Sequence, residues 1–389
     1  MDYDFDTAIN RRGTNSLKWD VGDDELPMWV ADMDFKTAPQ VAAAIAKRAQ
    51  SGVFGYEIIP DEWYSAITRW WSRRHNFEIK KDWLCFCTGV IPAVTSAVKR
   101  VTNHGDNVIV QTPVYDIFFH SIENTGRHVL ENKLLYQNGT YAIDFDDLEK
   151  KLADPLTTML ILCNPHNPAG RVWTKGELQK IGALCHRYGV TVLSDEIHCD
   201  LTEPNVYYTP FAAASEECKN NSITCVAPSK AFNLAGLQSA AVIVPRKDLR
   251  NKIVRGLNSD EVAEPNSFAI TGAIAAFNEG EEWLDALRVY LSENRKIALA
   301  FLKEHLPEIT AVEQTATYLL WLDCSAICTD TRPLCDHIRQ TTGLYITAGG
   351  QYRGDGKTFV RINVACPKTT LADGLNRLER GVKSFLPKL

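Results

Sequence analysis

The middle of the chain carries an alternation of strand and helix signals that restricts the possible folds more than any other feature. Residues 158–163, Thr-Met-Leu-Ile-Leu-Cys, form a short apolar run that predicts a buried strand. A capping box of Thr174 and Glu177 then opens an amphipathic helix, and Gly189 predicts its end. Residues 190–193 form the next apolar run. A strand, a helix and a second strand in this order predict a right-handed crossover within a parallel sheet.

The same pattern recurs on either side of this unit. Further strands are predicted at residues 84–87, 107–111 and 222–226. A helix is expected to open at Pro92, because proline lacks an N–H that the first turn would leave unpaired. We therefore predict an α/β fold with a mostly parallel central sheet and helices on both of its faces.

The C-terminal third has a different pattern and predicts a second, smaller α+β domain. Helices are expected at residues 281–302 and 371–385, and strands at 318–322 and 359–364. No linker rich in proline, glycine or serine divides the chain. We expect residues 1–45 to join the small domain, residues 46–280 to form the large domain, and residues 281–389 to form the small C-terminal domain.

Composition excludes several classes of function. The 48 acidic residues outnumber the 42 basic ones, whereas a nucleic-acid surface would be basic. No apolar run approaches the roughly 20 residues of a membrane span. The acidic start, Met1-Asp2-Tyr3-Asp4, argues against a secretory signal. The eleven scattered cysteines fit a reducing cytoplasm better than a disulfide framework, and their spacing matches no zinc pattern, so no metal site is expected.

Candidate functional residues follow the predicted strands. Ligands of open α/β sheets bind beyond the carboxyl ends of the strands, so one edge of the sheet should gather residues from several loops. These residues are Gly89, Tyr115, Asn167, Asp195 and Lys230. Together they suit a cofactor with a phosphate, an aromatic ring and an aldehyde.

Three of these side chains would do the chemistry, and each has a simpler alternative. A desolvated Lys230 would be a good amine nucleophile toward an aldehyde, but an isolated lysine is usually solvated. Asp195 could keep a pyridine nitrogen protonated, or it could cap the next helix. Asn167 could donate to a phenolate oxygen, or it could serve only as a turn residue between prolines.

The other candidates would bind and orient. The backbone amides of Gly89, Val90 and Ile91 precede a helix and could hold a phosphate. Tyr115 could stack on an aromatic ring, or it could simply pack in the core. Arg361 suits a substrate carboxylate, because its guanidinium bonds both oxygens, although a surface ion pair is the alternative.

The order of these residues resembles that of fold-type I pyridoxal-phosphate enzymes of the aminotransferase class I/II family. The resemblance rests on Asn-Pro-His-Asn-Pro-Ala-Gly at residues 164–170, Ser-Asp-Glu-Ile-His at 194–198, Ser-Lys-Ala-Phe-Asn-Leu-Ala-Gly at 229–236 and Phe-Val-Arg-Ile-Asn at 359–363. It runs nearly end to end and implies an aspartate-aminotransferase-like fold, the fold of pyridoxal-phosphate-dependent transferases.

Within that family the chain is more similar to the MalY/PatB-type carbon–sulfur β-lyases. The segments that carry this narrower resemblance are Arg-Gly-Thr at 12–14, Trp-Asp at 19–20, Trp-Val-Ala-Asp-Met-Asp-Phe at 29–35, Gly-Val-Phe-Gly-Tyr at 52–56 and Asp-Glu-Ile-His at 195–198.

The resemblance implies a role for each position toward pyridoxal 5′-phosphate. Lys230 would bind the cofactor aldehyde and move the Cα proton, and Asp195 would pair with the ring nitrogen. Asn167 would contact the ring hydroxyl. The remaining cofactor contacts would come from Tyr115 stacking on the ring, from His198, and from Gly89, Val90, Ile91 and Ser229 at the phosphate.

The same resemblance implies how the substrate and a second subunit take part. Arg361 would bind the substrate α-carboxylate, close to Val30 and Ala31. Tyr56 would reach the phosphate of the cofactor in the neighbouring subunit, so the protein is expected to be a homodimer with shared active sites.

Three positions depart from the common pattern of the family. Many relatives have a hydroxyl residue three before the lysine, where this chain has Ala227. Aminotransferases often hold the phosphate with an arginine eight after the lysine, where this chain has Gln238. Many have tyrosine three after the aspartate, where this chain has His198. These departures weaken the predicted phosphate contacts and leave the second partner of the ring hydroxyl open.

The resulting hypothesis is a cytoplasmic β-lyase that releases pyruvate, ammonia and a thiol from L-cystathionine or another S-substituted cysteine. An aminotransferase is the first alternative, because it needs the same Lys230, Asp195 and Arg361. The segment 29–35 favours the lyase. A regulatory or binding protein on the same scaffold is the alternative from another class.

Overall fold

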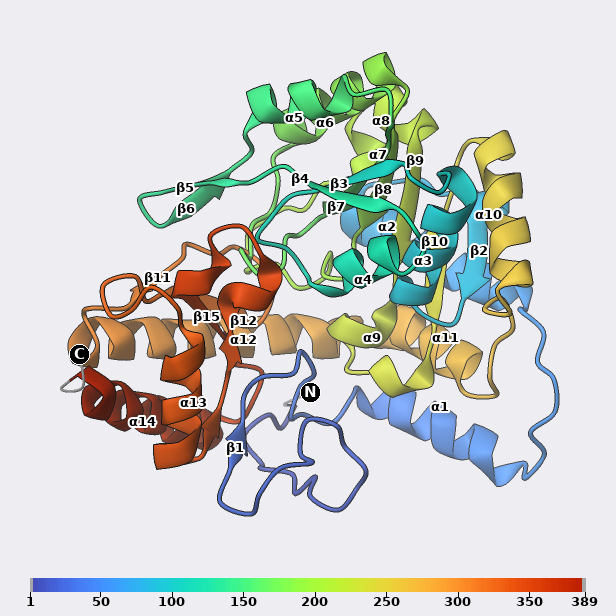
Figure 1. Ribbon diagram of the computed structural model, residues 1–389. Helices are drawn as coiled ribbons and strands as arrows, with labels where there is room; N and C mark the ends of the chain where they lie inside the picture. Colours follow the sequence, from blue (N-terminus) through green and yellow to red (C-terminus); the bar gives the residue numbers. More distant parts are fainter. Residues whose placement is uncertain (1–2, 387–389) are drawn as a thin grey trace.

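A seven-stranded sheet forms the centre of the larger part of the protein (Figure 1). The structure is a computed structural model that describes residues 3–386. The order of the strands across the sheet is β2 (Leu84–Cys87), β10 (Ala240–Ile243), β9 (Ser222–Val226), β8 (Thr191–Asp195), β7 (Thr157–Cys163), β3 (Asn107–Val110) and β4 (His128–Glu131).

The sheet is mostly parallel, as predicted. The pairs β4–β3, β3–β7, β7–β8 and β8–β9 are parallel, and only β10 runs antiparallel to its neighbours β9 and β2. Strand β10 was not among the predicted strands. The connection from β9 to β10 contains only the one-turn helix α9 (Pro228–Ala231) and the short turn η2 (Ala235–Leu237). A parallel return needs a longer crossover, usually a full helix, so β10 pairs in the opposite direction.

Helices cover both faces of this sheet. On one face, Met159 and Ile161 of β7 belong to a core with α3, α4 and α10. On the other face, Leu160 and Leu162 of the same strand belong to a core with α5, α6, α7 and α8. This alternation shows that β7 is buried on both sides, as its unbroken apolar sequence requires.

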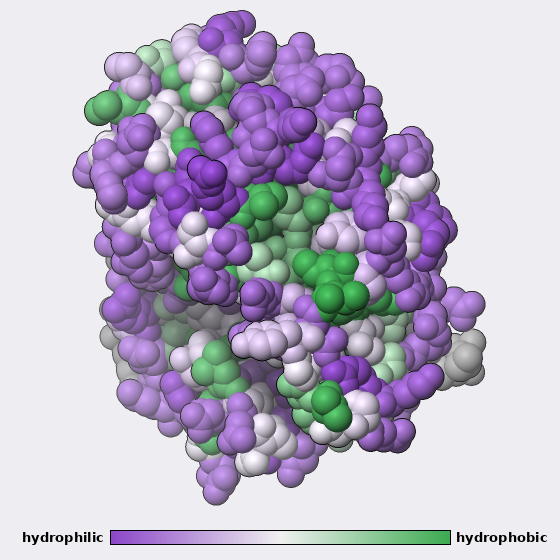
Figure 2. Space-filling view, turned by 90° about the vertical axis from the view of Figure 1, so that its right-hand side faces the viewer, coloured by the Kyte–Doolittle hydropathy of each residue, from purple (hydrophilic) through white to green (hydrophobic). Residues whose placement is uncertain are grey.

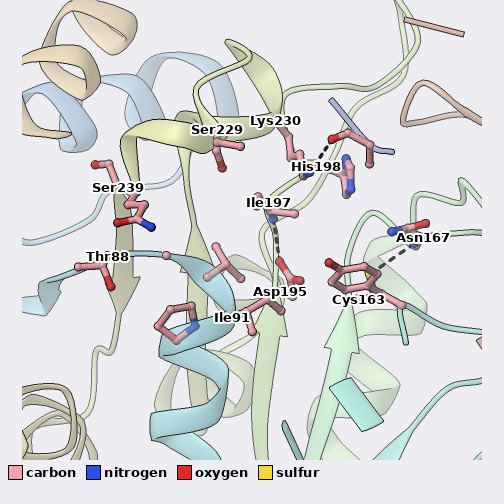
Figure 3. Close-up of a pocket in the computed structure, with 17 residues that line it drawn as sticks. Thr88, Ile91, Cys163, Asn167, Asp195, Ile197, His198, Ser229, Lys230 and Ser239 are labelled. Atoms are coloured by element: carbon pink, nitrogen blue, oxygen red, sulfur yellow. Dashed lines mark hydrogen bonds between the residues drawn. The ribbon is translucent and has the colours of Figure 1, made fainter. Parts of the chain in front are cut away.

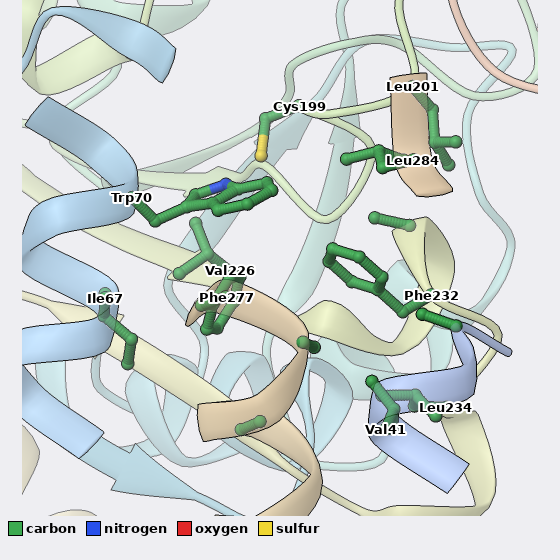
Figure 4. Packing of buried hydrophobic residues seen from close by; sticks show 14 of the residues in the cluster. Val41, Ile67, Trp70, Cys199, Leu201, Val226, Phe232, Leu234, Phe277 and Leu284 are labelled. Atoms are coloured by element: carbon green, nitrogen blue, oxygen red, sulfur yellow. The ribbon is translucent and has the colours of Figure 1, made fainter. Parts of the chain in front are cut away.

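A third group of buried residues continues the second face. There β2, β9 and β10 pack against α1, α2, α11 and α12. The indole of Trp70 lies 5.8 Å from the ring of Phe232 and 5.4 Å from the ring of Phe277, measured between centroids (Figure 4). This packing fixes the loop that follows β9, on which Lys230 lies.

The α-helices and their bounds are α1 (Pro39–Gln50), α2 (Asp61–His75), α3 (Val90–Val101), α4 (Ile117–Glu123), α5 (Phe145–Leu152), α6 (Lys175–Tyr188), α7 (Phe211–Ala214), α8 (Glu216–Asn220), α10 (Lys247–Ser259), α11 (Ala269–Glu279), α12 (Glu281–His305), α13 (Arg332–Thr342) and α14 (Lys368–Phe385). Helix α6 begins with the predicted capping box and ends at Gly189, which has a φ of 69°. No helix among residues 3–386 is long and apolar enough to cross a membrane.

Three predicted helix boundaries differ from the structure: α12 continues past residue 302 to His305, α14 begins at Lys368 and not at Leu371, and the start of α3 is also wrong. Helix α3 begins at Val90 and not at Pro92, with Gly89 as its N-cap residue. The first internal bond runs from the amide of Ala93 to the carbonyl of Gly89 at 3.1 Å. Proline at the third position leaves the backbone amides of Val90 and Ile91 in the first turn, where an α-helix has no internal acceptors for them.

The C-terminal region contains a four-stranded sheet in the order β11 (Thr310–Ala311), β12 (Leu319–Asp323), β15 (Phe359–Asn363) and β14 (Thr347–Ala348). The N-terminal segment reaches this region, because β1 (Leu26–Pro27) pairs in parallel with β13 (Leu344–Tyr345). The remaining strands, β5 (Leu135–Gln137) and β6 (Thr140–Ala142), form a hairpin. The division into domains at residues 45 and 280 stays a prediction.

Candidate active site

A cavity of about 290 Å³ lies at the carboxyl edge of the central sheet (Figure 3). It brings together most of the predicted site residues, namely Ala31, Gly89, Val90, Ile91, Tyr115, Asn167, Asp195, His198, Ser229 and Lys230. The other lining residues were not among the predicted site residues; they are Thr88, Pro92, Cys163, Ile197, Ala235, Gln238 and Ser239. Three of the seven, Thr88, Pro92 and Ile197, are sequence neighbours of a predicted residue, and that proximity is the only signal that could have identified them.

Lys230 reaches the cavity from the one-turn helix α9, directly after β9. Its Nζ atom donates to the carbonyl oxygen of Ala31 at 2.6 Å. Burial and the nearby charge of Arg361 lower the pKa of this amine to about 8, against the opposing effect of Asp32 and Asp195. A larger fraction of neutral amine at neutral pH is what a nucleophile toward an aldehyde needs.

Asp195 is the last residue of β8 and is 4% exposed. Its Oδ1 atom accepts from the amide of Ile197 at 3.1 Å. Burial raises the pKa of this carboxyl to about 7. No cationic side chain of residues 3–386 lies within 4.0 Å of it. The residues after Asp195 form turns, so the alternative role as a helix cap is excluded.

Arg361 lies on β15 and contacts Asn167, which lines the cavity, although Arg361 is not itself among the lining residues. Its Nη1 atom donates to Oδ1 of Asn167 at 3.3 Å, and its Nη2 atom donates to the carbonyl of Trp29 at 3.1 Å. The residue is 6% exposed, and its Nε atom has no hydrogen-bond partner within residues 3–386. The alternative of a surface ion pair is therefore excluded.

Tyr115 and Asn167 lie next to each other at the ends of neighbouring strands. The amide of Tyr115 donates to the carbonyl of Asn167 at 3.1 Å. Because the side-chain oxygen of Asn167 already accepts from Arg361, its amide nitrogen is left to donate into the cavity. This arrangement suits an acceptor such as a ring hydroxyl oxygen.

The end of the cavity near helix α3 suits an anion by its amide and hydroxyl groups, but it has little positive charge. Gly89, Val90 and Ile91 form the start of the helix, and Ser229, Thr88 and Ser239 provide hydroxyl groups. Gln238, in the left-handed conformation with φ 53°, lies where relatives often have arginine. Lys230 is the only lysine or arginine among the residues described as lining the cavity.

His198 is a neutral imidazole beside Lys230. Burial and the charges of Lys230 and Arg361 lower its pKa to about 3. Its Nδ1 atom is buried and has no partner among the described residues. A ring substituent with an oxygen atom would supply that partner.

The segment 29–35 is held by side chains from β15 of the smaller sheet and from the connection between β9 and β10. The carbonyl of Val30 accepts from Asn363 at 2.6 Å, and that of Met33 accepts from Asn233 at 3.0 Å. Tyr318, which the sequence analysis missed, donates from its hydroxyl to the carbonyl of Ala31 at 3.0 Å. No local sequence pattern marks Tyr318, because its partner lies 287 positions away.

Arg361, Val30 and Tyr56 are the predicted site residues that do not line this cavity. Arg361 contacts the lining residue Asn167 and Val30 precedes the lining residue Ala31, whereas no such contact is described for Tyr56. It belongs to a segment without helix or strand between α1 and α2, and its side chain is fully exposed. Its predicted contact with the cofactor of a partner subunit is therefore still a prediction.

Comparison with known proteins identifies the family. The model of the family "Aminotransferase class I and II" matches residues 24–378. The chain belongs to this family. It is 42% identical over 381 residues to cystathionine beta-lyase PatB of Bacillus subtilis, covering 96% of this chain and 98% of PatB. It is 33% identical to the protein MalY of Escherichia coli, covering 98% and 99% of the two chains.

A solved structure with the same fold is cystalysin from Treponema denticola, which contains a pyridoxal 5′-phosphate cofactor. The two structures superpose with a TM-score of 0.95 at 34% identity, covering 99% of this chain and all of the other. The predicted fold class and family are thus confirmed.

Proposed function

We propose that the protein is a pyridoxal-phosphate-dependent carbon–sulfur β-lyase that acts on L-cystathionine or related S-substituted cysteines. The contact of Lys230 with Ala31 is the observation that carries this proposal. It joins the nucleophilic lysine to the segment 29–35, the part of the sequence that favours the lyase over the aminotransferase. The likeness to PatB over nearly the whole of both chains supports the same reaction class.

The cavity fits pyridoxal phosphate by the chemistry of its side chains. Asp195 is a buried carboxylate that lacks an ion pair, and a protonated ring nitrogen would provide one. The unpartnered Nδ1 atom of His198 and the free amide of Asn167 suit the ring hydroxyl. When bound, the cofactor supplies an aldehyde for the amino group and a ring that accepts the electrons left at Cα.

Residues of the chain then bind the substrate and transfer its proton. Arg361 binds the α-carboxylate of the amino acid and fixes its orientation. Lys230, once its nitrogen is free, takes the proton from Cα, and elimination of the thiolate from Cβ follows. The final products of this elimination are a thiol, pyruvate and ammonia.

A product assay tests the proposal against the aminotransferase alternative. The purified protein with added pyridoxal phosphate is expected to release pyruvate and a thiol from L-cystathionine without any 2-oxo acid. Turnover that needs 2-oxoglutarate and yields glutamate would establish the aminotransferase instead. A Lys230→Ala variant serves as the control for cofactor chemistry in solution.

We further propose a homodimer in the cytoplasm. Exposed apolar side chains gather on the segment between α1 and α2, where Val53, Phe54, Tyr56 and Ile58 are each more than half exposed. Figure 2 shows apolar residues around a hollow on the side of the molecule where this segment runs in Figure 1. A second subunit would cover them. All eleven cysteines are free thiols, which fits a reducing compartment.

A further inference from the structure

The carboxylate of Asp116 has no ionic partner close to the substrate-binding arginine. It directly follows Tyr115, which lines the cavity; Asp116 is half-buried and is not itself among the lining residues. Its Oδ2 atom accepts one hydrogen bond, from Nε2 of Gln351 at 3.3 Å. Within residues 3–386, neither Asp116 nor Arg361 has a residue of opposite charge within 4.0 Å.

The surroundings place Asp116 on the Arg361 side of the cavity. Gln351 belongs to the short turn η3 (Gly349–Tyr352), and the guanidinium of Arg361 lies 5.0 Å from the ring centroid of Tyr352 in the same turn. The amide of Val114 donates to the carbonyl of Tyr352 at 3.0 Å, which ties the turn to the strand end that carries Tyr115 and Asp116.

A structural role does not account for this carboxylate. Asp116 is the N-cap residue of α4, but its side chain makes no capping hydrogen bond. Burial raises its pKa, whereas hydrogen bonds from the backbone amides of Asp116 and Ile117 and the charges of Arg361 and His120 oppose that shift. A partly desolvated carboxylate that has no cation in direct contact is stabilised by a ligand that supplies one.

We propose that Asp116, held by Gln351, binds an ammonium group at the far end of the substrate's S-substituent. The inference rests on the proposed lyase function and names its substrate class: S-substituted cysteines that carry a second amino group. L-cystathionine belongs to this class.

Binding of the substrate α-carboxylate to Arg361 would strengthen the preference of Asp116 for a substrate ammonium group. Arg361 is the cation that most strongly favours the charged form of Asp116. Once Arg361 pairs with the substrate carboxylate, its charge no longer compensates Asp116. A substrate ammonium then neutralises the charge of the Asp116 carboxylate, whereas an apolar S-substituent leaves that charge without a partner.

Two substrates of nearly equal size test the inference. S-(2-aminoethyl)-L-cysteine and S-propyl-L-cysteine differ in a terminal ammonium or methyl group. The wild-type enzyme is expected to favour the first by kcat/KM. The Asp116→Asn variant should reduce this preference about tenfold, because a charged hydrogen bond becomes a neutral one, with little change for S-propyl-L-cysteine.

The control is Glu123→Gln at the end of the same helix, whose carboxylate pairs with Arg353 at 2.7 Å on the surface. Its substrate preference should equal that of the wild type. An unchanged preference in Asp116→Asn would overturn the inference while leaving the lyase function intact, since both substrates would still yield pyruvate.

Binding measurements keep the test independent of turnover. Calorimetry with L-lysine and L-2-aminoheptanoic acid, which have no leaving group at Cβ, compares the same two terminal groups at the same distance from Cα. Tighter binding of L-lysine that is lost in Asp116→Asn would support the inference even if neither cysteine derivative is eliminated. Equal binding of the two amino acids to the wild type would overturn it.

Discussion

The amine of Lys230 and the carbonyl oxygen of Ala31 lie 2.6 Å apart, although the two residues are separated by 199 positions in the chain. The same oxygen accepts from the hydroxyl of Tyr318 at 3.0 Å. The acceptor of the lysine is thus held by a residue that precedes β12 of the smaller sheet. This arrangement gives the free amine a defined position beside the cavity.

Removal of the Tyr318 hydroxyl should therefore slow proton transfer by Lys230. We expect Tyr318→Phe to lower kcat about tenfold and to change KM less than twofold, because a misplaced base weakens the transition state more than substrate binding. Exchange of the Cα proton of L-norleucine in D₂O, followed by NMR, isolates this step. Tyr64→Phe on α2, outside the cavity lining, should behave as the wild type, and normal exchange in Tyr318→Phe would refute the positioning role.

The lowered pKa of Lys230 has a measurable consequence in the cofactor-free protein. An amine reacts only when it is neutral, so its reactivity should rise with pH around a midpoint of about 8, well below the ordinary lysine value of 10.5. Pulse acetylation followed by mass spectrometry measures this midpoint for each lysine. In the holoenzyme, borohydride should fix the cofactor on the peptide that contains Lys230. A midpoint near 10.5, or a label on another lysine, would contradict the assignment.

Asp195 should matter far more for the reaction than for cofactor binding. Asp195→Ala removes the partner of the ring nitrogen, and we expect the rate to fall by at least about 100-fold while the cofactor still binds. Absorbance of bound cofactor and steady-state rates measure the two effects separately. Near-normal turnover in this variant would show that the carboxylate does not serve the ring.

The raised pKa of Asp195 also predicts how it affects stability. The folded, cofactor-free protein holds this proton up to about pH 7, whereas the unfolded chain releases it near 3.8. The ionised form is thus unfavourable in the fold, and its cost appears as the pH rises from 4 through 7. Asp195→Asn should raise the Tm of the cofactor-free protein at pH 8 and leave it nearly unchanged at pH 4. A lower Tm at pH 8 would be the opposite result.

The exposed Tyr56 allows a test of shared active sites by mixing two inactive chains. A Lys230→Ala chain and a chain with an inactivating replacement of Tyr56 are combined under conditions in which subunit exchange is shown independently. If Tyr56 serves the partner's site, one site of the mixed dimer has an intact lysine and an intact tyrosine, so activity returns. If Tyr56 serves its own chain, every site keeps one defect and mixing restores nothing.

Local sequence signals predicted the elements whose ends are determined by local chemistry. The capping box at Thr174 and the left-handed Gly189 bound helix α6 as expected, and strand β9 matches its predicted range. The start of α3 was predicted two residues too late, because proline is also compatible with the third helical position. Strand β10 was missed, since its place in the sheet depends on a short connection and not on its own sequence.

The sequence by itself determined which functional side chains the site contains. Strand-end loops carry Lys230, Asp195, Asn167 and Tyr115, and parallel strands place such loops at one edge for a general topological reason. Only the tertiary structure decided which groups pair and which are left without a partner. The contact of Lys230 with Ala31, the hydroxyl of Tyr318 and the unpaired carboxylate of Asp116 all depend on segments that are distant in sequence. Burial likewise sets the pKa of Lys230 and Asp195, because desolvation depends on what packs around a charge and not on its neighbours in the chain.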